Sequence, residues 1–249
     1  LKKRKINLKI LKNKKKILKN IQAEARNVRY KILINYCRKN SIKILLTAHN
    51  LEDQVETFLI RLSRGSGLKG LSSMRSLTKI DNKVSLYRPL LEVKKNSLIK
   101  ISKKIFGKFV KDPSNKNTKF LRTKIRNLKK PLESSGIKYD QIFRSIQNLS
   151  ISKNTLDQHL NKTFKDLISK RNKKIVIDFK KFKGLNIEVK IALLNKSIKM
   201  LKKNYYDLRS KKVVNLIKNL NKKKFKKATL GGCIFFKKDQ YLCLKAEKN

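Results

Sequence analysis

The sequence is poor in acidic residues, histidine and cysteine, and it contains no tryptophan. Asp and Glu number 16 among 249 residues, against 67 Lys and Arg, and the formal net charge is +51. No run of 18 apolar residues occurs, which excludes a membrane-spanning helix. Cys37, Cys233 and Cys243 lack CxxC spacing, and only His49 and His159 accompany them, which argues against a structural zinc site. These absences favour a chain that works in a reducing cytoplasm, away from a membrane.

The excess of positive charge predicts a polyanionic partner. A field this positive attracts nucleic acid at least non-specifically. However, 54 of the 67 basic residues are lysine, and an A+T-rich genome produces a composition rich in Lys, Asn and Ile without selection for binding. Lysines on solvated faces are therefore the alternative. With 39% hydrophobic residues, the chain has enough apolar side chains for one large domain or two modest ones.

The first half of the chain predicts an α/β domain. Helical spacing of apolar residues extends over 22–38, a short and largely buried strand of the parallel type over 42–48, and a second helix from about residue 51 to Gly65. The core stripe of that second helix comprises Val55, Phe58, Leu59 and Leu62, with Asp53, Glu56 and Thr57 on the opposite side. Sites in α/β proteins lie outside the carboxyl ends of the strands, which is where the sequence places His49.

The remaining segments predict a division near residue 131. Before it we expect a strand over 84–86, a helix over 96–106, a turn over 111–115 and a helix over 118–129 that ends before Pro131. After it we expect helices over 140–170, 187–203 and 207–222, a short strand over 175–177, and a hairpin of strands 228–236 and 241–244. The predicted organisation is an α/β catalytic domain (residues 1–131), a mainly helical domain (residues 132–222) and a small β hairpin (residues 223–249).

The scarce acid is concentrated in one place. His49, Glu52, Asp53 and Glu56 lie within eight positions, at the junction of the predicted strand and the second helix. Asp53 and Glu56 are three residues apart on one helix, so their carboxylates can converge on an ammonium or a magnesium ion. The alternative is ordinary helix capping, with Asn50 as the N-cap and Asp53 in the first turn. The spacing alone does not decide between them.

Two further features have a functional and a structural interpretation. Arg122 and Arg126 are four residues apart on a predicted helix, an arrangement that suits gripping phosphates, but a solvated basic face has the same pattern. Gly65-Ser66-Gly67 could hold a phosphate, and a helix C-terminus explains it equally well.

Six motifs, in a fixed order, resemble one known family. They are A-R-N-V-R-Y at 25–30, T-A-H-N-L-E-D-Q-V-E-T at 47–57, R-L-S-R-G-S-G-L-K-G-L at 61–71, R-P-L-L at 88–91, D-P-S-N at 112–115 followed by Arg122 and Arg126, and T-L-G-G-C at 229–233. Together they resemble the tRNA(Ile)-lysidine synthases, which are N-type ATP pyrophosphatases. The resemblance implies a Rossmann-like parallel sheet of the adenine nucleotide alpha hydrolase type, followed by a helical tRNA-binding domain.

The resemblance also implies a reaction and a set of site residues. In that reaction ATP, with Mg²⁺, adenylates the C2 oxygen of the wobble cytidine of tRNA(Ile) with a CAU anticodon and releases pyrophosphate, and free L-lysine then displaces AMP to give lysidine. Asp53 and Glu56 would hold the amine of lysine, with Arg29 nearby and His49 beside the adenylate. The arginines expected to contact phosphates of tRNA or nucleotide are Arg26, Arg61, Arg64, Arg122 and Arg126. The resemblance favours a cytoplasmic homodimer and implies no metal ligand in this chain.

The sequence departs from the family pattern in one large and three small ways. The phosphate-binding string S-G-G-x-D-S does not occur in the 249 residues, and the family pattern places it before Leu1. Asn50 stands where the family has His, Glu52 where it has Asp, and Thr123 where it has Asn. The alternative to a ligase is therefore a non-catalytic, basic tRNA-binding relic. A basic structural protein of the ribosomal kind is disfavoured, because it would not carry the ordered motifs.

Overall fold

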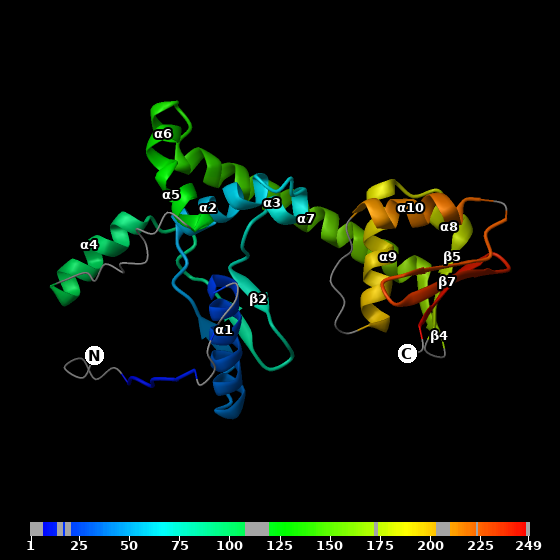
Figure 1. Ribbon diagram of the computed structural model, residues 1–249, viewed down its shortest axis with the longest axis horizontal. Coiled ribbons are helices and arrows are strands. Elements are labelled where there is room, and N and C mark those ends of the chain that lie inside the picture. The colour runs from blue at the N-terminus through cyan, green and yellow to red at the C-terminus, as the bar shows by residue number, and fades with distance from the viewer. Residues whose placement is uncertain are drawn as a thin grey trace. The chain divides into compact units, whose positions relative to one another are not determined.

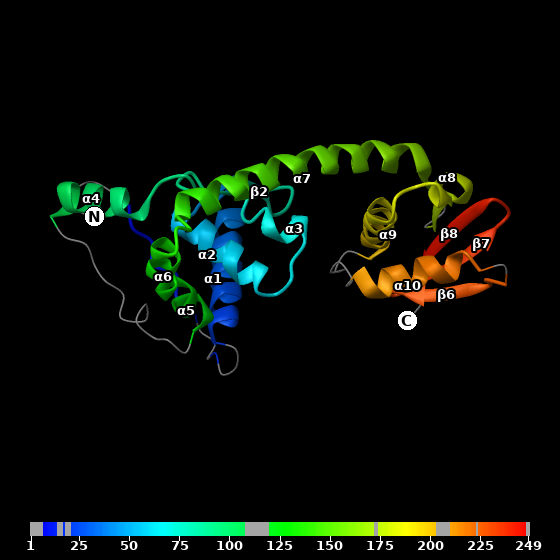
Figure 2. The ribbon, with the colours of Figure 1, turned by 90° about the horizontal axis from the view of Figure 1, so that it is seen from above.

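Two compact units make up the chain (Figure 1). The structure is a computed structural model, and it describes residues 7–13, 17, 21–107, 120–171, 174–202, 210–222 and 224–247. The units are Leu1–Ile151 and Ser152–Asn249. Helix α7, Tyr139–Leu167, contains the division, and Figure 2 shows it as one continuous helix. The boundary predicted near residue 131 falls within the first unit.

The first unit contains a mixed sheet that has three strands among the described residues. They are β1 (Ile44–Leu46), β2 (Leu77–Lys79) and β3 (Ser85–Tyr87), in the order β1-β3-β2. β1 is parallel to β3, and β2 is antiparallel to it. Helix α1 (Ile21–Lys39) precedes β1 and helix α2 (Leu51–Leu62) follows it, so the predicted α/β class is confirmed. β2 was not predicted, because a strand of three residues is too short to show a clear alternation.

β1 is not the largely buried strand that the sequence predicted. Ile44 and Leu46 are more than half exposed, and only Leu45 between them is partly covered. The physical reason is the position of β1 in the sheet: it lies at an edge, and among the described residues it pairs only with β3. A continuous apolar run indicates burial on both faces only where elements cover both faces.

Helix α2 is held by a small core of its own unit. Val55 is fully buried and Leu51 nearly so, and the residues packed with them come from α7: Tyr139, Ile142, Phe143 and Ile146. Phe58 and Leu59 are partly buried against the same cluster, as their spacing predicted. Leu62, predicted to complete the stripe, is half exposed, because it is the last residue of α2 and lies beyond the cluster.

Short helices complete the first unit. They are α3 (Leu68–Leu71), α4 (Lys95–Phe106), α5 (Leu121–Asn127) and α6 (Lys129–Ser134). The helix predicted over 118–129 is thus two helices that meet at Leu128, and Pro131 lies inside α6 instead of beyond a helix end. Proline is tolerated there because the first turn of a helix needs no backbone N–H donor. The turn predicted at 111–115, including Asp112-Pro113-Ser114-Asn115, lies outside the described residues.

The second unit packs helices against an antiparallel sheet. The strands are β4 (Ile168–Arg171), β5 (Lys174–Asp178), β6 (Lys227–Leu230), β7 (Cys233–Lys238) and β8 (Tyr241–Ala246), in the order β4-β5-β8-β7-β6. The helices are α8 (Phe179–Lys183), α9 (Ile187–Leu201) and α10 (Ser210–Leu220). Their core includes Ile175, Leu194, Val213, Phe235 and Leu244. Among the described residues no helix is both long and apolar enough to cross a membrane.

Two predicted elements of this unit are different in the structure. The strand predicted over 228–236 is two strands, because Gly231 and Gly232 have φ angles of 62° and 69° and form a turn between them. The helix predicted over 140–170 ends at Leu167, where the chain enters β4. The residues of the predicted hairpin, 223–249, therefore supply three strands of the larger sheet, paired to β5 through β8.

Candidate functional site

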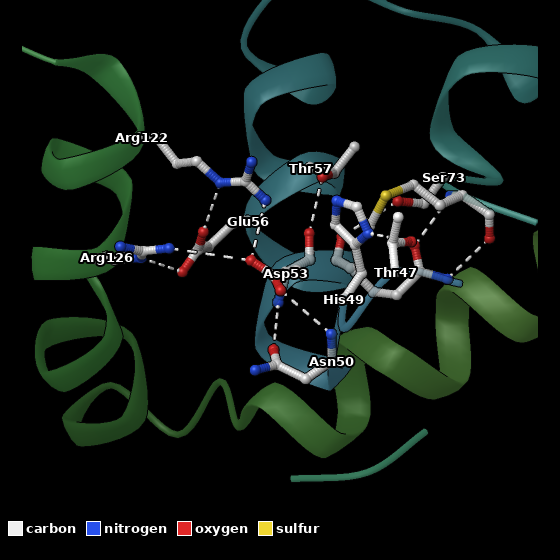
Figure 3. A network of polar contacts seen from close by, with 11 residues as sticks. Thr47, His49, Asn50, Asp53, Glu56, Thr57, Ser73, Arg122 and Arg126 are labelled. Atoms are coloured by element: carbon white, nitrogen blue, oxygen red, sulfur yellow. Dashed lines mark hydrogen bonds and ion pairs between the residues drawn. The ribbon is translucent and has the colours of Figure 1, made fainter. Parts of the chain in front are cut away.

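The N-terminus of α2 is a capping box directly after β1 (Figure 3). The Asn50 side chain accepts a hydrogen bond from the backbone N–H of Asp53 at 3.0 Å, and the Asp53 carboxylate accepts one from the N–H of Asn50 at 3.1 Å. These bonds satisfy backbone donors that the first helical turn leaves without partners. The capping interpretation of Asp53 is thus correct, but it uses only Oδ2 and leaves Oδ1 for another partner.

Two arginines of α5 reach the carboxylates of α2 (Figure 3). Arg122 donates from Nε to Glu56 at 2.8 Å and from Nη2 to Asp53 at 3.0 Å. Arg126 donates from Nε to the other oxygen of Glu56 at 2.6 Å, and its Nη2 lies 3.8 Å from Asp53. The four residues form one network, which we call the α2–α5 cluster. Arg122 and Arg126 therefore do not form a solvated basic face.

Burial differs sharply within the α2–α5 cluster. The side chain of Glu56 is 4% exposed and that of Asp53 is 19% exposed, while both arginines are about one-third exposed. Glu56 thus lies under α5, although the helical wheel placed it on the face opposite the core. Burial lowers the pKa of Arg126, but the hydrogen bond to Glu56 and the charges of Glu56 and Asp53 outweigh that effect and raise it. The cluster therefore favours the charged form of Arg126.

Glu52, the third acidic residue of the motif at 47–57, connects other helices. Its carboxylate accepts a hydrogen bond from the backbone N–H of Lys95 at 2.8 Å, and it lies 3.7 Å from the amine of Lys129. Glu52 therefore binds the start of α4 and of α6 to α2. These contacts are structural, and Glu52 makes them in place of the aspartate that the family pattern has at this position.

His49 lies between β1 and α2, beside the α2–α5 cluster. Its Nδ1 is 2.9 Å from the hydroxyl of Thr47, whose N–H donates to the carbonyl of Tyr87 on β3. Burial lowers the pKa of His49, and nearby Arg88, Arg26 and Arg122 lower it further, against the opposing charge of Asp53. The imidazole is therefore neutral at physiological pH and able to accept a proton.

The lowered pKa of His49 predicts that the stability of the fold depends on pH. With the folded pKa of His49 below its ordinary value of 6.5, the unfolded chain binds more protons at mildly acidic pH. The stabilisation by neutral His49 is complete above pH 6.5 and is lost as the pH falls through the folded pKa. Between about pH 7.5 and about pH 5.5, the free energy of unfolding should fall less in His49→Gln than in wild type. His159→Gln, which replaces an exposed histidine of α7, is the matched control. Equal losses in all three proteins would contradict the lowered pKa of His49.

Arg88 is a buried cation that the sequence analysis assigned to a motif but to no role. Its Nη1 donates to the carbonyl of Arg75 at 2.8 Å and to the hydroxyl of Thr78 at 3.0 Å. Its Nε is buried without a hydrogen-bond partner. Because Arg88 directly follows β3, it lies at the same sheet end as His49. The signal that could have identified it is a charged residue directly after a predicted strand.

The other predicted arginines have different surroundings. Arg26 and Arg29 of α1 lie over the ring of Tyr30, at 5.2 and 5.9 Å from its centre, and both are exposed. Arg64 is also exposed. Arg61 donates to the carbonyls of Gly70 and Ser73 at 2.7 and 3.0 Å, and burial lowers its pKa. The structure therefore brings Arg26 near His49 and engages Arg61 with its own loop.

The glycine-rich loop after α2 ends the helix. Gly65 has φ of 65°, and the N–H groups of Gly65 and Ser66 donate to the carbonyls of Leu62 and Arg61. These donors point back at the helix and are already bonded, so they do not form a phosphate cradle. Across the described part of the chain, no group of three or more His, Cys, Asp or Glu residues could hold a metal ion.

Comparisons with known proteins agree with the motifs. The PP-loop domain family matches residues 1–132. A tRNA(Ile)-lysidine synthase of Wolbachia pipientis wMel is 33% identical over 222 residues, covering 88% of this chain and 51% of the relative. The tRNA(Ile)-lysidine synthase of Orientia tsutsugamushi is 45% identical over 118 residues, which cover 47% of this chain and 26% of the relative. That of Bradyrhizobium diazoefficiens is 45% identical over 116 residues, which cover 47% of this chain and 32% of the relative. The chain spans about half the length of the Wolbachia relative.

Proposed function

The chain belongs to the PP-loop domain family, and we propose that it forms part of an ATP-dependent ligase that modifies tRNA. In the proposed reaction, ATP first adenylates the C2 oxygen of the wobble cytidine of tRNA(Ile) with a CAU anticodon, and pyrophosphate leaves. The ε-amine of free lysine then attacks C2, the C2–N bond forms, and the C2–O bond breaks as AMP leaves. Support for this reaction comes from the similarity to tRNA(Ile)-lysidine synthases and from the geometry of the α2–α5 cluster.

The observation that carries the proposal is the pairing of Asp53 with Arg122. A partly exposed carboxylate and a partly exposed guanidinium lie 3.0 Å apart at the carboxyl end of β1. A free amino acid is a zwitterion, so it can place an ammonium on the carboxylate and its own carboxylate on the guanidinium. Each carboxylate oxygen has two lone pairs, so Asp53 can accept a further donor without releasing Arg122. We therefore assign lysine binding to Asp53 and Arg122.

Glu56 has a different part in this proposal. With 4% of its side chain exposed and one arginine Nε on each oxygen, Glu56 is covered by Arg122 and Arg126. A ligand amine could reach it only by displacing those bonds. Glu56 thus acts as a positioning residue, which fixes the guanidinium group of Arg122 beside Asp53. Such fixed charges stabilise developing negative charge on phosphate better than mobile ones do.

His49 is the proposed proton acceptor. The attacking amine must lose a proton, and a neutral imidazole with a lowered pKa can accept it. The contact between Nδ1 and the hydroxyl of Thr47 orients the ring, and Nε2 is the accepting atom in the tautomer in which Nδ1 donates to that hydroxyl. The carboxylates of Asp53 and Glu56 are bonded to Arg122 and Arg126, so we assign neither of them to magnesium. Phosphate groups of ATP would require donors beyond the glycine-rich loop, whose N–H groups are bonded to α2.

A hybrid protein tests the reaction. This chain would replace the matched region of the Wolbachia pipientis relative, and incorporation of labelled lysine into a tRNA(Ile) transcript with a CAU anticodon would be measured. We expect incorporation that requires ATP, and we expect Asp53→Asn to raise the KM for lysine at least roughly tenfold. Asp140→Asn, which removes an exposed carboxylate paired with Lys94, should leave the KM unchanged.

The same experiment addresses the alternative of a tRNA-binding relic. That alternative is supported by the net charge of +51 and by the absence of S-G-G-x-D-S from the 249 residues. It predicts that the chain binds tRNA with a steep dependence on salt but that the hybrid incorporates no lysine. Absence of lysine incorporation in a folded, tRNA-binding hybrid would therefore reject the ligase and leave the relic. An unchanged lysine KM in Asp53→Asn would reject the role of Asp53 alone.

A further inference from the structure

Gln54 is a buried polar residue of α2 to which the proposed reaction gives no part. It is 5% exposed, and its amide binds both main-chain groups of one residue. Nε2 donates to the carbonyl of Met74 at 2.8 Å, and the N–H of Met74 donates to Oε1 at 2.8 Å. A side-chain amide has donors and an acceptor at one end, so it can bind a peptide group as a neighbouring strand does. Gln54 therefore fixes the main chain at a point 20 residues further along.

The segment that Gln54 holds contains an unfavourable backbone conformation. Ser73, directly before Met74, has φ of 57° and is 8% exposed. A residue with a Cβ is strained in this left-handed region. The hydroxyl of Ser73 donates to the carbonyl of Gln54 at 3.1 Å. Strained conformations persist only where the surroundings hold them, and they are concentrated at functional sites. The conformation of Ser73 therefore marks this segment for a closer look at what else holds it.

Two arginines bind the same segment. Arg61 of α2 donates to the carbonyl of Ser73 at 3.0 Å, and Arg88 donates to the carbonyl of Arg75 at 2.8 Å. The carbonyls of Ser73, Met74 and Arg75 thus each accept a hydrogen bond from a different side chain. We call these three residues the clamped segment. Three consecutive carbonyls held in this way leave the main chain little freedom to move.

The clamped segment is connected to His49 through Arg88. The guanidinium that binds the carbonyl of Arg75 is close enough to His49 for its charge to act on the imidazole. Figure 3 shows Ser73 on the same side of α2 as His49, whereas the arginines of the α2–α5 cluster lie on the other side. Helix α2 thus presents its carboxylates to α5 on one side and holds the clamped segment on the other.

We propose that Gln54 is a positioning residue for the proposed reaction, which fixes the clamped segment and, through the carbonyl of Arg75, the guanidinium of Arg88 beside His49. This role rests on the proposed function, in which His49 accepts a proton. A displaced carbonyl at Arg75 would let the buried guanidinium move relative to the imidazole. The lysine site assigned to Asp53 lies on the other side of α2, so Gln54 acts on turnover and not on lysine affinity.

Lysine incorporation by the hybrid protein measures the effect on turnover. Gln54→Met keeps the length of the side chain and removes both hydrogen bonds to Met74. We expect kcat to fall at least roughly tenfold with the KM for lysine unchanged, because small displacements of reacting groups slow the chemical step. The matched control is Gln141→Met, which removes an exposed hydrogen bond from the N–H of Lys138 and should change neither constant.

The titration of His49 in the 249-residue chain is a second readout, which does not require activity. The chain contains two histidines, so NMR can follow His49 with the exposed His159 as an internal reference. Burial and the charge of Arg88 lower the pKa of His49, so a loosened clamped segment should raise this pKa toward its ordinary value of 6.5. Gln54→Met retains the other charges that act on His49, namely Asp53, Arg26 and Arg122.

Together the two readouts decide the role of Gln54. A lower kcat, an unchanged KM for lysine and a raised pKa of His49 in Gln54→Met support the proposal. An unchanged kcat, an unchanged titration of His49, or a KM that rises as much as kcat falls would overturn it.

A milder variant covers the case in which Gln54→Met does not fold. Ser73→Ala removes only the hydrogen bond to the carbonyl of Gln54, and it should change kcat and the pKa of His49 in the same directions by smaller amounts. No change in either quantity would then overturn the proposal. Failure of the proposed function is distinguishable, because it abolishes incorporation in the unsubstituted hybrid, whereas failure of the positioning role leaves that hybrid active.

Discussion

Replacing Glu56 with alanine should lower the free energy of unfolding of the first unit by about 2 to 3 kcal/mol. The substitution leaves two guanidinium groups facing each other without the carboxylate that receives an Nε donor from each. Removing one partner of a fully buried ion pair costs about 3 to 5 kcal/mol, and the value is reduced here because both arginines are about one-third exposed. Urea unfolding, followed by hydrogen exchange of α2 and α5 amides, would measure the effect.

The loss of stability on replacing Glu56 should depend on the charge of its side chain and not only on its volume. Glu56→Gln keeps the shape of the side chain, and we expect it to recover only a minor part of the lost stability. In a double-mutant cycle, Glu56→Gln should cost much less when Arg126 is already methionine, because one unpaired cation is then absent. Asp140→Asn is the control, since its pair with Lys94 is exposed. A loss in Glu56→Ala no larger than in Asp140→Asn would show that the cluster does not hold α5.

Local sequence patterns predicted most of the elements near the site, because capping and helical spacing depend on residues that are close in sequence. Asn50 and Asp53 form the capping box, and Val55 faces the core. The same patterns gave the i, i+4 spacing of Arg122 and Arg126. They did not say what this pair faces. The partners on α2 are 66 and 70 positions away, and a helix as short as α5 does not reveal which side is covered.

Burial was the property that the sequence predicted least well. Glu56 was expected on the solvent side of α2, but α5 lies on that side and covers it. Leu46 was expected to be buried, but no described element covers its face of the sheet. Both cases have the same physical cause: the side chain's environment depends on an element from elsewhere in the fold, or on its absence. The family motifs contain Asp53, Glu56, Arg122 and Arg126, which the structure brings together in one cluster although they are distant in sequence.

The concentration of acid was the most useful sequence signal for the site. In a chain with 67 basic and 16 acidic residues, a solvated carboxylate has many possible ion-pair partners. Asp53 and Glu56 nonetheless share the same two arginines, and both arginines come from one short helix. The local concentration of acidic residues in the sequence thus corresponds to a defined network of ion pairs, the α2–α5 cluster. This network also leaves Asp53 more exposed than Glu56, at 19% against 4% of the side chain.

A core substitution in the second unit should have an effect as large as that of Glu56→Ala, but confined to that unit. Leu194 of α9 is fully buried among Ile175, Leu193 and Phe235. Leu194→Ala should lower the free energy of unfolding of the second unit by about 2 to 5 kcal/mol, because it removes apolar contacts and leaves a cavity. Ile187→Ala, on the same helix but about half exposed, is the control and should have a small effect.

The location of the segments that Leu194→Ala destabilises shows whether the two units unfold independently. The buried cluster around Leu194 consists of residues from Phe164 onward, whereas the cluster around Val55 ends at Ile146. Leu194→Ala should therefore speed amide exchange in α9, β5 and β8 and leave α2 unchanged, because substitutions without shared partners act additively. Equal acceleration in α2 would show that α7, which supplies residues to both clusters, couples them into one cooperative unit. Unchanged exchange throughout would contradict the burial of Leu194 itself.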